Sequence, residues 1–233
     1  MGLLYKYRAC NEYTEAIFTT GCLHYSHPSD FNDPYDCQWS CEKKKQHIYI
    51  DRVAKNKVRL IPINVDELQK TIQNEINDIE VCCFSKTGLQ IQMWSHYADG
   101  HKGLCLVFDD ELLLDRRHCD AREVVYQDKK VVTADILPEE PTENAIRFIY
   151  TKGRLWEYEE EVRYIHKPEP EYSNGNYPFN KQALKAIYFG TNCTPHNIME
   201  YRKLCYENGF NHVRFYKIKL ADNNMYELEP ELI

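Results

Sequence analysis

Residues 156–163 hold the densest group of side chains that could do chemistry. The segment reads WEYEEEVR, so four carboxylates stand within five residues, directly before an apolar run. If a strand begins early there, Glu159, Glu161 and Arg163 alternate onto one face. Two carboxylates on one face repel, and burial would raise the pKa of one of them unless a partner neutralises it. Arg163 can be that partner, which predicts a Glu–Arg pair on the sheet; a solvated acidic turn is the ordinary alternative.

Two further candidates stand at the ends of predicted strands. Arg8 ends a first strand, where period 2 places it on the same face as Lys6. Its guanidinium suits two phosphate oxygens at once, whereas an ion pair at the sheet edge is the more common role. Ser85 ends an apolar strand, and its hydroxyl can orient a ribose or simply begin a turn. No local motif supplies a histidine base, so we do not expect Ser85 to be a nucleophile.

A short aromatic helix carries the next candidates. Helical spacing in MWSHYA, residues 93–98, puts Trp94 near Tyr97 on one face, a pattern more typical of a core than of a ligand shelf. His96 is more often a structural histidine than a catalytic one. Metal binding is not expected, because Cys37 and Cys41 have no second Cys/His pair at zinc-like spacing.

The elements that must position these residues mix strands and helices without regular βαβ alternation, which predicts an α+β fold in a single domain over residues 1–233. Residues 41–60 lack clear periodicity, and residues 167–180 are rich in Pro, Gly and Asn, which indicates a loop. Helices are expected at 12–20, 66–79, 89–98, 142–150 and 195–208, with Gly21 as a left-handed stop after the first. Strands are expected at 3–7, 22–26, 81–84, 104–108, 121–126, 161–166, 186–189, 212–220 and 226–228.

Composition limits the classes of function. The net charge of −7 argues against a broad, sequence-blind nucleic-acid binder. No secretory signal opens the sequence and no apolar run is long enough for a membrane span, so we expect a cytoplasmic protein with no membrane partner. The ten scattered cysteines are then reduced thiols packed as small apolar side chains.

Several blocks together resemble a family of bacterial and phage proteins known only as a domain of unknown function. The blocks cover most of the chain in the expected order. They are YKYR (5–8), FNDPYD (31–36), CFS (83–85), MWSHYADGHKGLCLVF (93–108), WEYEEEVR (156–163) and IYFG (187–190).

A more distant resemblance supplies a mechanism. Arg8, Ser85 and Glu161, each at the end or start of a strand, are similar to the Arg–Ser–Glu pattern of ADP-ribosyltransferases. That resemblance implies a mixed, mostly antiparallel, split sheet flanked by helices, with NAD as substrate. It implies that Arg8 holds NAD, that Ser85 supports the site, and that Glu161, or else Glu159, bonds the nicotinamide ribose. Further residues expected to contact NAD are Trp94, His96, Tyr97, Arg163, Asn32 and Asp33.

The residue types suit that reaction. Loss of nicotinamide passes through an oxocarbenium-like state, which a preorganised carboxylate stabilises. The acceptor, a protein or a nucleic acid, and the oligomeric state are left open, and a role as a toxin or in phage defence is implied by resemblance only. Two other interpretations stay open: a metal-dependent phosphodiesterase or nuclease using His96 or His101 with Asp33 and Asp36, and a non-catalytic nucleotide-binding module. The transferase hypothesis requires Arg8, Ser85 and the carboxylates to converge in one cleft.

Overall fold

The computed structural model describes residues 2–38, 48–54, 57–62, 64–113, 119–131, 140–172, 174–222 and 225–233. Contacts divide the chain into two compact units, each assembled from segments that are distant in sequence. Unit 1 comprises Met1–Tyr25, Val81–Glu123 and Glu157–Ile233, and unit 2 comprises Ser26–Glu80 and Val124–Trp156. The single domain expected over residues 1–233 stays a prediction.

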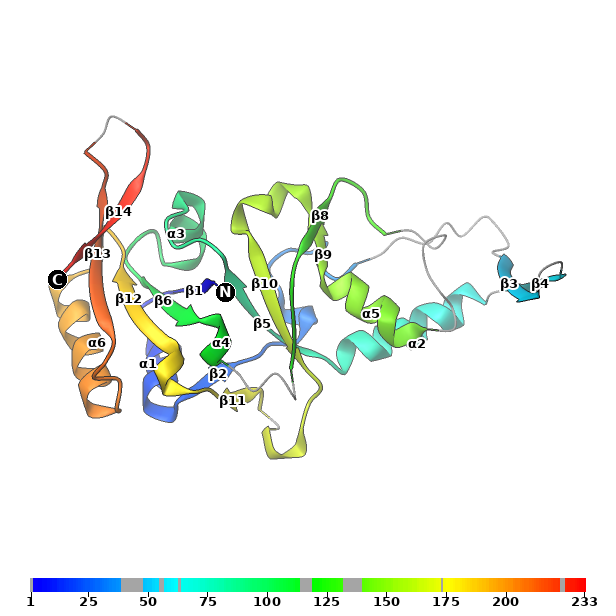
Figure 1. The fold of residues 1–233 in the computed structure, drawn as a ribbon, viewed down its shortest axis with the longest axis horizontal. Coiled ribbons are helices and arrows are strands. Elements are labelled where there is room, and N and C mark those ends of the chain that lie inside the picture. The colour runs from blue at the N-terminus through cyan, green and yellow to red at the C-terminus, as the bar shows by residue number, and fades with distance from the viewer. Residues whose placement is uncertain are drawn as a thin grey trace. The chain divides into compact units, whose positions relative to one another are not determined.

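Unit 1 is built on an eight-stranded sheet in the order β14-β13-β12-β6-β1-β5-β10-β7 (Figure 1). β1 runs antiparallel to both β5 and β6, whereas β12 runs parallel to β13. This confirms the α+β class with a large, mixed, mostly antiparallel sheet flanked by helices. The strands are β1 (Leu3–Arg8), β5 (Glu80–Ser85), β6 (Leu104–Asp109), β7 (Asp120–Glu123), β10 (Glu161–His166), β12 (Leu184–Phe189), β13 (Arg214–Leu220) and β14 (Leu228–Leu232).

Four α-helices and a small second sheet complete unit 1. Asn11 caps the first helix by accepting a hydrogen bond from the Thr14 amide, and Gly21 ends it at φ 69°, as predicted. Thr194 caps the last helix in the same way, with Pro195 in its first turn. The helices are α1 (Glu12–Thr20), α3 (Ile91–Tyr97), α4 (Asp110–Leu113) and α6 (Pro195–Glu207); β2 (Cys22–His24) pairs with β11 (Asn176–Pro178).

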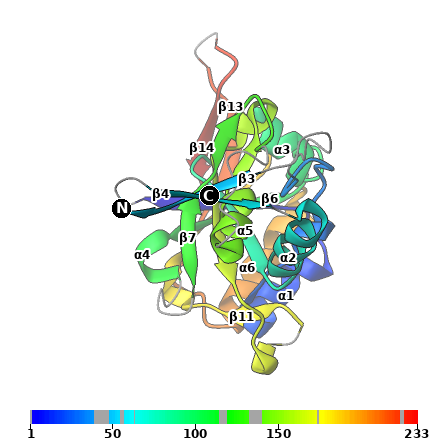
Figure 2. The ribbon, with the colours of Figure 1, turned by 90° about the vertical axis from the view of Figure 1, so that its right-hand side faces the viewer.

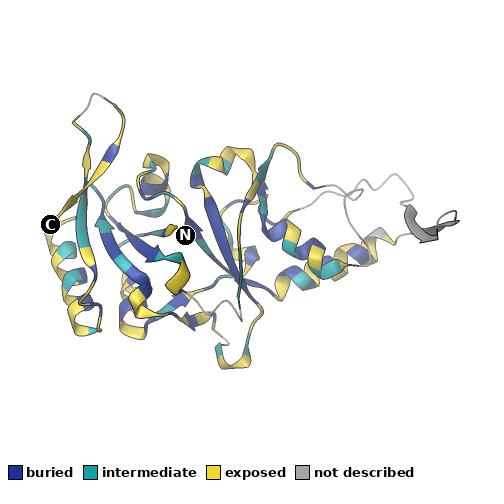
Figure 3. Cartoon of the chain, viewed as in Figure 1, coloured by how far each residue is buried: buried dark blue, intermediate teal, exposed yellow. Residues whose placement is uncertain are grey.

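The sheet has two different faces, which we call the α1 face and the α3 face. On the α1 face, Leu4, Phe84 and Tyr164 pack in the larger core with Phe18 of α1. On the α3 face, Tyr7 packs in a smaller core with Met93 and Trp94 of α3. Side chains alternate between the two faces along a strand. Once one residue of a strand is known to pack on a face, the faces of the other residues of that strand follow. β10 is buried along its whole length (Figure 3).

Gly103 stands where α3 leads into β6, and a side chain has no room there. A Cβ at this position would meet the carbonyl oxygen of Arg8 well inside contact distance. We expect Gly103→Ala to lower the free energy of unfolding by about 1–3 kcal/mol, the usual cost of overpacking. Gly153→Ala is the control, because no atom lies within 4 Å of the Cβ it would add. Urea denaturation measures both, and equal stability of the two variants would contradict the packing account.

Unit 2 pairs two helices, and its remaining described elements are short. α2 and α5 lie side by side, as Figures 1 and 2 show. Asn64 caps α2 by accepting from the Glu67 amide. The elements are a 3₁₀ helix (Pro28–Asp30), β3 (Ile48–Ala54), β4 (Lys57–Pro62), α2 (Val65–Asn77), β8 (Val125–Gln127), α5 (Pro141–Ile149) and β9 (Thr151–Gly153).

The expected elements agree with these bounds to within a few residues at most sites. Residues 41–60 lack clear periodicity in the sequence, and no element was assigned there, but the antiparallel hairpin β3–β4 covers much of the segment. The loop expected at 167–180 contains β11, which pairs with β2. Backbone pairing of a short strand needs no apolar alternation, so neither had a sequence signal. Within the described ranges, no helix combines the length and apolar content needed to cross a bilayer.

Candidate functional site

Ser85 and Glu161 lie together on the α3 face, where β5 ends and β10 begins. The two strands are neighbours in the sheet, and the Lys86 amide donates to the Glu160 carbonyl at 2.9 Å. Cys82 and Phe84 belong to the α1 face, so Cys83 and Ser85 point to the other side. Burial raises the pKa of the Cys83 thiol, and the adjacent Glu161 carboxylate raises it further. The predicted proximity of Ser85 to the acidic segment is therefore present.

Glu161 and Arg163 form a buried two-pronged ion pair on the same face. Arg163 Nε donates to Glu161 Oε1 at 2.9 Å, and an Nη donates to Oε2 at 3.0 Å. The side chains are 0% and 6% exposed, respectively. The Glu–Arg pair expected from the alternation is confirmed. Arg163 donates to both oxygens of Glu161 and its guanidinium is fully buried, so Arg163 positions the carboxylate. Its expected contact with NAD stays a prediction.

Glu159 approaches the same face from the 3₁₀ helix Arg154–Glu159, not from an early start of β10. Its side chain is buried, and Tyr97 of α3 donates its hydroxyl hydrogen to Glu159 Oε1 at 2.6 Å. His96 Nδ1 lies 3.1 Å from the Tyr158 hydroxyl beside it. Two side chains of α3 thus contact the acidic segment, and Tyr97 lies next to a carboxylate as a ligand-contacting residue would.

Between the two buried carboxylates stands exposed Glu160, whose φ is 43°. A non-glycine residue in the left-handed region is uncommon, and such strain gathers at functional sites. The turn it makes lets Glu159 and Glu161 both point inward. This strained turn adds a structural reason to regard the acidic segment as a site.

Trp94 belongs to the core and not to a ligand shelf. It is 0% exposed, its Nε1 donates to the Gly88 carbonyl at 3.0 Å, and its ring meets Tyr7 edge-on at 5.2 Å. Its expected contact with NAD stays a prediction. The helical spacing of Trp94 and Tyr97 is compatible with a core position and with a ligand contact. The full burial of Trp94 indicates that this side chain belongs to the core.

Arg8 points to the opposite face of the sheet. It shares the α1 face with Leu4, and its Nε donates to Thr14 Oγ1 of α1 at 3.2 Å. Burial lowers the pKa of its guanidinium. The expected convergence of Arg8 with Ser85 and Glu161 is therefore wrong: two of the three share a face, and Arg8 instead anchors α1.

A cavity of about 570 Å³ lies in unit 1 where β5 ends. β5 lies between β1 and β10 and ends at Ser85, which pairs with Tyr5 of β1. β1 continues past this pair to Leu3, where its other edge still pairs with β6. Beyond Ser85, no residue of β5 therefore separates β1 from β10. Two cations line the cavity, Lys86 and Arg122, with Tyr5, Glu123 and Val162 among its other walls. Lys86 pairs with Glu123 at 2.8 Å and Arg122 with Asp120 at 2.7 Å. These pairs are largely exposed, so an anionic ligand can compete for both cations.

The cavity and the carboxylates are neighbours along the chain. Lys86 follows Ser85, and Val162 follows Glu161, yet neither Glu159 nor Glu161 lines the cavity. The volume falls within the usual range for small-molecule sites, about 300–1,000 Å³. The end of β5 therefore brings a cavity lined by two cations and two carboxylates into one region with a fixed buried carboxylate.

Asn32 and Asp33 lie in unit 2, Asn32 exposed and Asp33 buried, whereas the carboxylates of the acidic segment lie in unit 1. Their expected contact with NAD stays a prediction. The hydrolase alternative divides in the same way, with His96 and His101 in unit 1 and Asp33 and Asp36 in unit 2. Among the described residues, no group of three or more His, Cys, Asp or Glu side chains could hold a metal; Cys41 lies outside them.

Tyr5 and Tyr7 were not recognised as site residues from the sequence. Tyr7 donates its hydroxyl hydrogen to the Thr87 carbonyl at 2.8 Å, which fixes the chain just after Ser85. Tyr5 lies opposite Ser85 in the register. The alternation in YKYR puts both tyrosines on one face of the strand, and this pattern could have identified them as site residues.

Comparison with known proteins finds one family model that matches a part of the chain including the acidic segment. Residues 93–164 match the family model described as "Protein of unknown function (DUF2971)". The matched segment runs from α3 to β10 and so includes Tyr97, Glu159, Glu161 and Arg163. The resemblance to a family of unknown function is thereby confirmed. No curated protein and no solved structure matches the chain.

Proposed function

We propose that the chain carrying this DUF2971 segment cleaves the nicotinamide–ribose bond of NAD and transfers ADP-ribose. The single observation that carries the proposal is the arrangement at the end of β5. There Ser85 lies beside Glu161 on adjacent strands, and Arg163 holds both oxygens of that carboxylate. The convergence of Arg8 with these residues, which the hypothesis from the sequence required, is absent, so the proposal rests on Ser85, Glu161 and Arg163, with other cations in place of Arg8.

Glu161 supports the reaction because its charge is oriented before substrate arrives. In the proposed step the bond from ribose C1′ to the nicotinamide nitrogen breaks, and its electron pair leaves with nicotinamide. Arg163 donates to both oxygens of the Glu161 carboxylate, which fixes the direction in which its charge points. A fixed negative charge next to the developing oxocarbenium ion stabilises the transition state. The acceptor, or water, then bonds to C1′ and gives its proton to solvent.

The cavity beyond Ser85 supplies the cations that a pyrophosphate needs. Lys86 and Arg122 replace Arg8 in this role, and each makes an exposed ion pair with which an anion can compete. A volume of about 570 Å³ suits part of a dinucleotide. We propose that the phosphates lie there, with the nicotinamide ribose at Glu161 and Tyr97 beside it.

Lys86→Ala should raise the KM for NAD by about tenfold, because removing one charge-assisted contact to a phosphate costs about 1.5–3 kcal/mol. Arg8→Met is the contrasting variant. It should lower stability through its lost hydrogen bond to Thr14 and leave the KM of the folded protein within about twofold. Steady-state kinetics with thermal melts measures both variants. A larger KM effect for Arg8→Met than for Lys86→Ala would restore Arg8 to the site.

The proposal is tested by incubating purified protein with NAD and quantifying free nicotinamide. The incubation is run alone and with cell lysate, protein, DNA or RNA, because the acceptor is not specified. Release in at least one condition is expected, with labelled ADP-ribose appearing on the acceptor. Binding of NAD without release under every condition would favour the non-catalytic nucleotide-binding module, and metal-dependent nuclease activity without NAD turnover would favour the hydrolase. A toxin or phage-defence role depends on which acceptor is found.

A further inference from the structure

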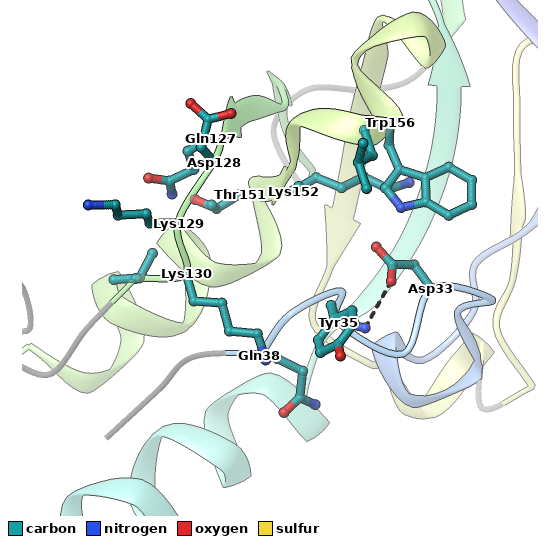
Figure 4. A pocket seen from close by; sticks show the side chains of 13 residues that line it. Asp33, Tyr35, Gln38, Gln127, Asp128, Lys129, Lys130, Thr151, Lys152 and Trp156 are labelled. Atoms are coloured by element: carbon teal, nitrogen blue, oxygen red, sulfur yellow. Dashed lines mark hydrogen bonds between the residues drawn. The ribbon is translucent and has the colours of Figure 1, made fainter. Parts of the chain in front are cut away.

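Unit 2 contains a cavity of its own, separate from the residues used above. It measures about 230 Å³ and is formed by three short segments of the unit. One is the turn after the 3₁₀ helix Pro28–Asp30, the second follows β8, and the third runs from β9 to Trp156 (Figure 4). Every residue that lines it belongs to unit 2.

Buried charges stand at the base of this cavity. The Lys152 side chain is 5% exposed, and its Nζ lies 3.6 Å from Oδ2 of Asp36. Asp33 is also buried, and its Oδ1 accepts a hydrogen bond from the Tyr35 amide at 2.9 Å (Figure 4). These charges give the base of the cavity polar groups, and Lys152 is compensated there by Asp36.

Two lining lysines, one exposed and one buried, lie against aromatic rings. Lys130 Nζ lies 4.3 Å from the ring centre of Tyr35, and Lys152 Nζ lies 5.0 Å from that of Trp156. Lys129 is exposed beside them, so three lysines face two aspartates, Asp33 and Asp128, among the lining residues. Lys152 is paired with Asp36, so the exposed Lys129 and Lys130 are the lining cations that an anionic ligand can reach.

We infer that this cavity binds one nucleotide unit, that is, a nucleobase carrying a phosphate. The two exposed lysines meet the phosphate, and Tyr35 and Trp156 form flat apolar walls for the base. Asp33 accepts from an amino group on the base edge, as carboxylates do with cytosine. The volume lies below the usual range for small-molecule sites, which suits one nucleotide unit and not a dinucleotide. This inference does not rest on the proposed NAD chemistry.

The test is isothermal titration of the full chain with the four common nucleoside monophosphates, their nucleosides, inorganic phosphate and a short single-stranded oligonucleotide. A monophosphate should bind more tightly than both its nucleoside and phosphate alone. The double variant Lys129→Ala/Lys130→Ala should weaken binding by about tenfold or more, and Trp156→Ala by about fivefold or more. Lys70→Ala, an exposed lysine on α2 of the same unit, should leave it unchanged.

Both lysines of the double variant are exposed, so that variant is expected to fold, and its thermal melt checks this. The free monophosphates and the oligonucleotide show whether the cavity takes a free nucleotide or one nucleotide of a single strand. Tight binding by either one, lost in the double variant, supports the inference. Three results would overturn the inference. Inorganic phosphate could bind as tightly as the nucleotides, the double variant could bind as tightly as the unchanged chain, or no nucleotide could bind at millimolar concentration. NAD turnover is not read in this test, so its failure leaves the proposed function untouched.

Discussion

Replacing Glu161 with glutamine should reduce the rate of nicotinamide release by about 100- to 1,000-fold. The substitution keeps the shape of the side chain and removes the negative charge that stabilises the oxocarbenium-like state, and preorganised electrostatic groups have effects of this size. The KM for NAD should change little, because the phosphates are bound elsewhere. Single-turnover measurement of nicotinamide release reads the loss directly.

Two control variants make this result specific. Glu159→Gln decides between the two buried carboxylates of the segment, and we expect it to retain more activity than Glu161→Gln. Glu171→Gln changes an exposed carboxylate beyond the other end of β10 and should have no effect. Equal activity of the Glu161 and Glu171 variants would remove Glu161 from the mechanism.

Replacing Arg163 with methionine should lower the free energy of unfolding by about 3–5 kcal/mol. The variant leaves the Glu161 carboxylate buried without its bidentate partner, and breaking a buried ion pair has this cost. Stability should fall less at low pH, because the pKa of a buried carboxylate that has lost its cation is raised, so protonation removes the buried charge as pH decreases. Denaturant unfolding at several pH values measures both effects.

The double variant Glu161→Leu/Arg163→Met separates stability from catalysis. Replacing both charges by apolar side chains of similar size is often neutral, so the double variant should be more stable than Arg163→Met. It should nevertheless release no nicotinamide, because the carboxylate is absent. Recovery of activity together with stability would show that the pair is structural only.

The local elements were predictable where sequence carries a local signal. α1 has an Asn cap at its start and a glycine at its end, and its observed bounds, Glu12–Thr20, match those expected. β10 is apolar at alternate positions after an acidic run, and it too matches. The hairpin β3–β4 and strand β11 were missed because backbone pairing between short segments leaves little trace in side-chain pattern.

The site was predictable only within a strand. Period 2 correctly joined Glu161 to Arg163, because both belong to β10. The same alternation put Arg8 and Lys6 on one face of β1. Whether that face of β1 is on the same side of the sheet as Glu161 of β10 depends on the register between the strands. Register is set by tertiary packing, here by Leu4 and Tyr164 in one core and Tyr7 in the other. This register puts Ser85 on the face of Glu161 and Arg8 on the opposite face, and the sequence alone specified neither.

The most direct measurement is a crystal structure of the full chain with a non-hydrolysable NAD analogue. The proposal requires a hydroxyl of the nicotinamide ribose within about 2.6–3.2 Å of the Glu161 carboxylate, the distance of a productive hydrogen bond. It also requires the pyrophosphate to lie near Lys86 and Arg122. A ligand bound on the α1 face beside Arg8, with Glu161 untouched, would contradict the proposed site and its chemistry.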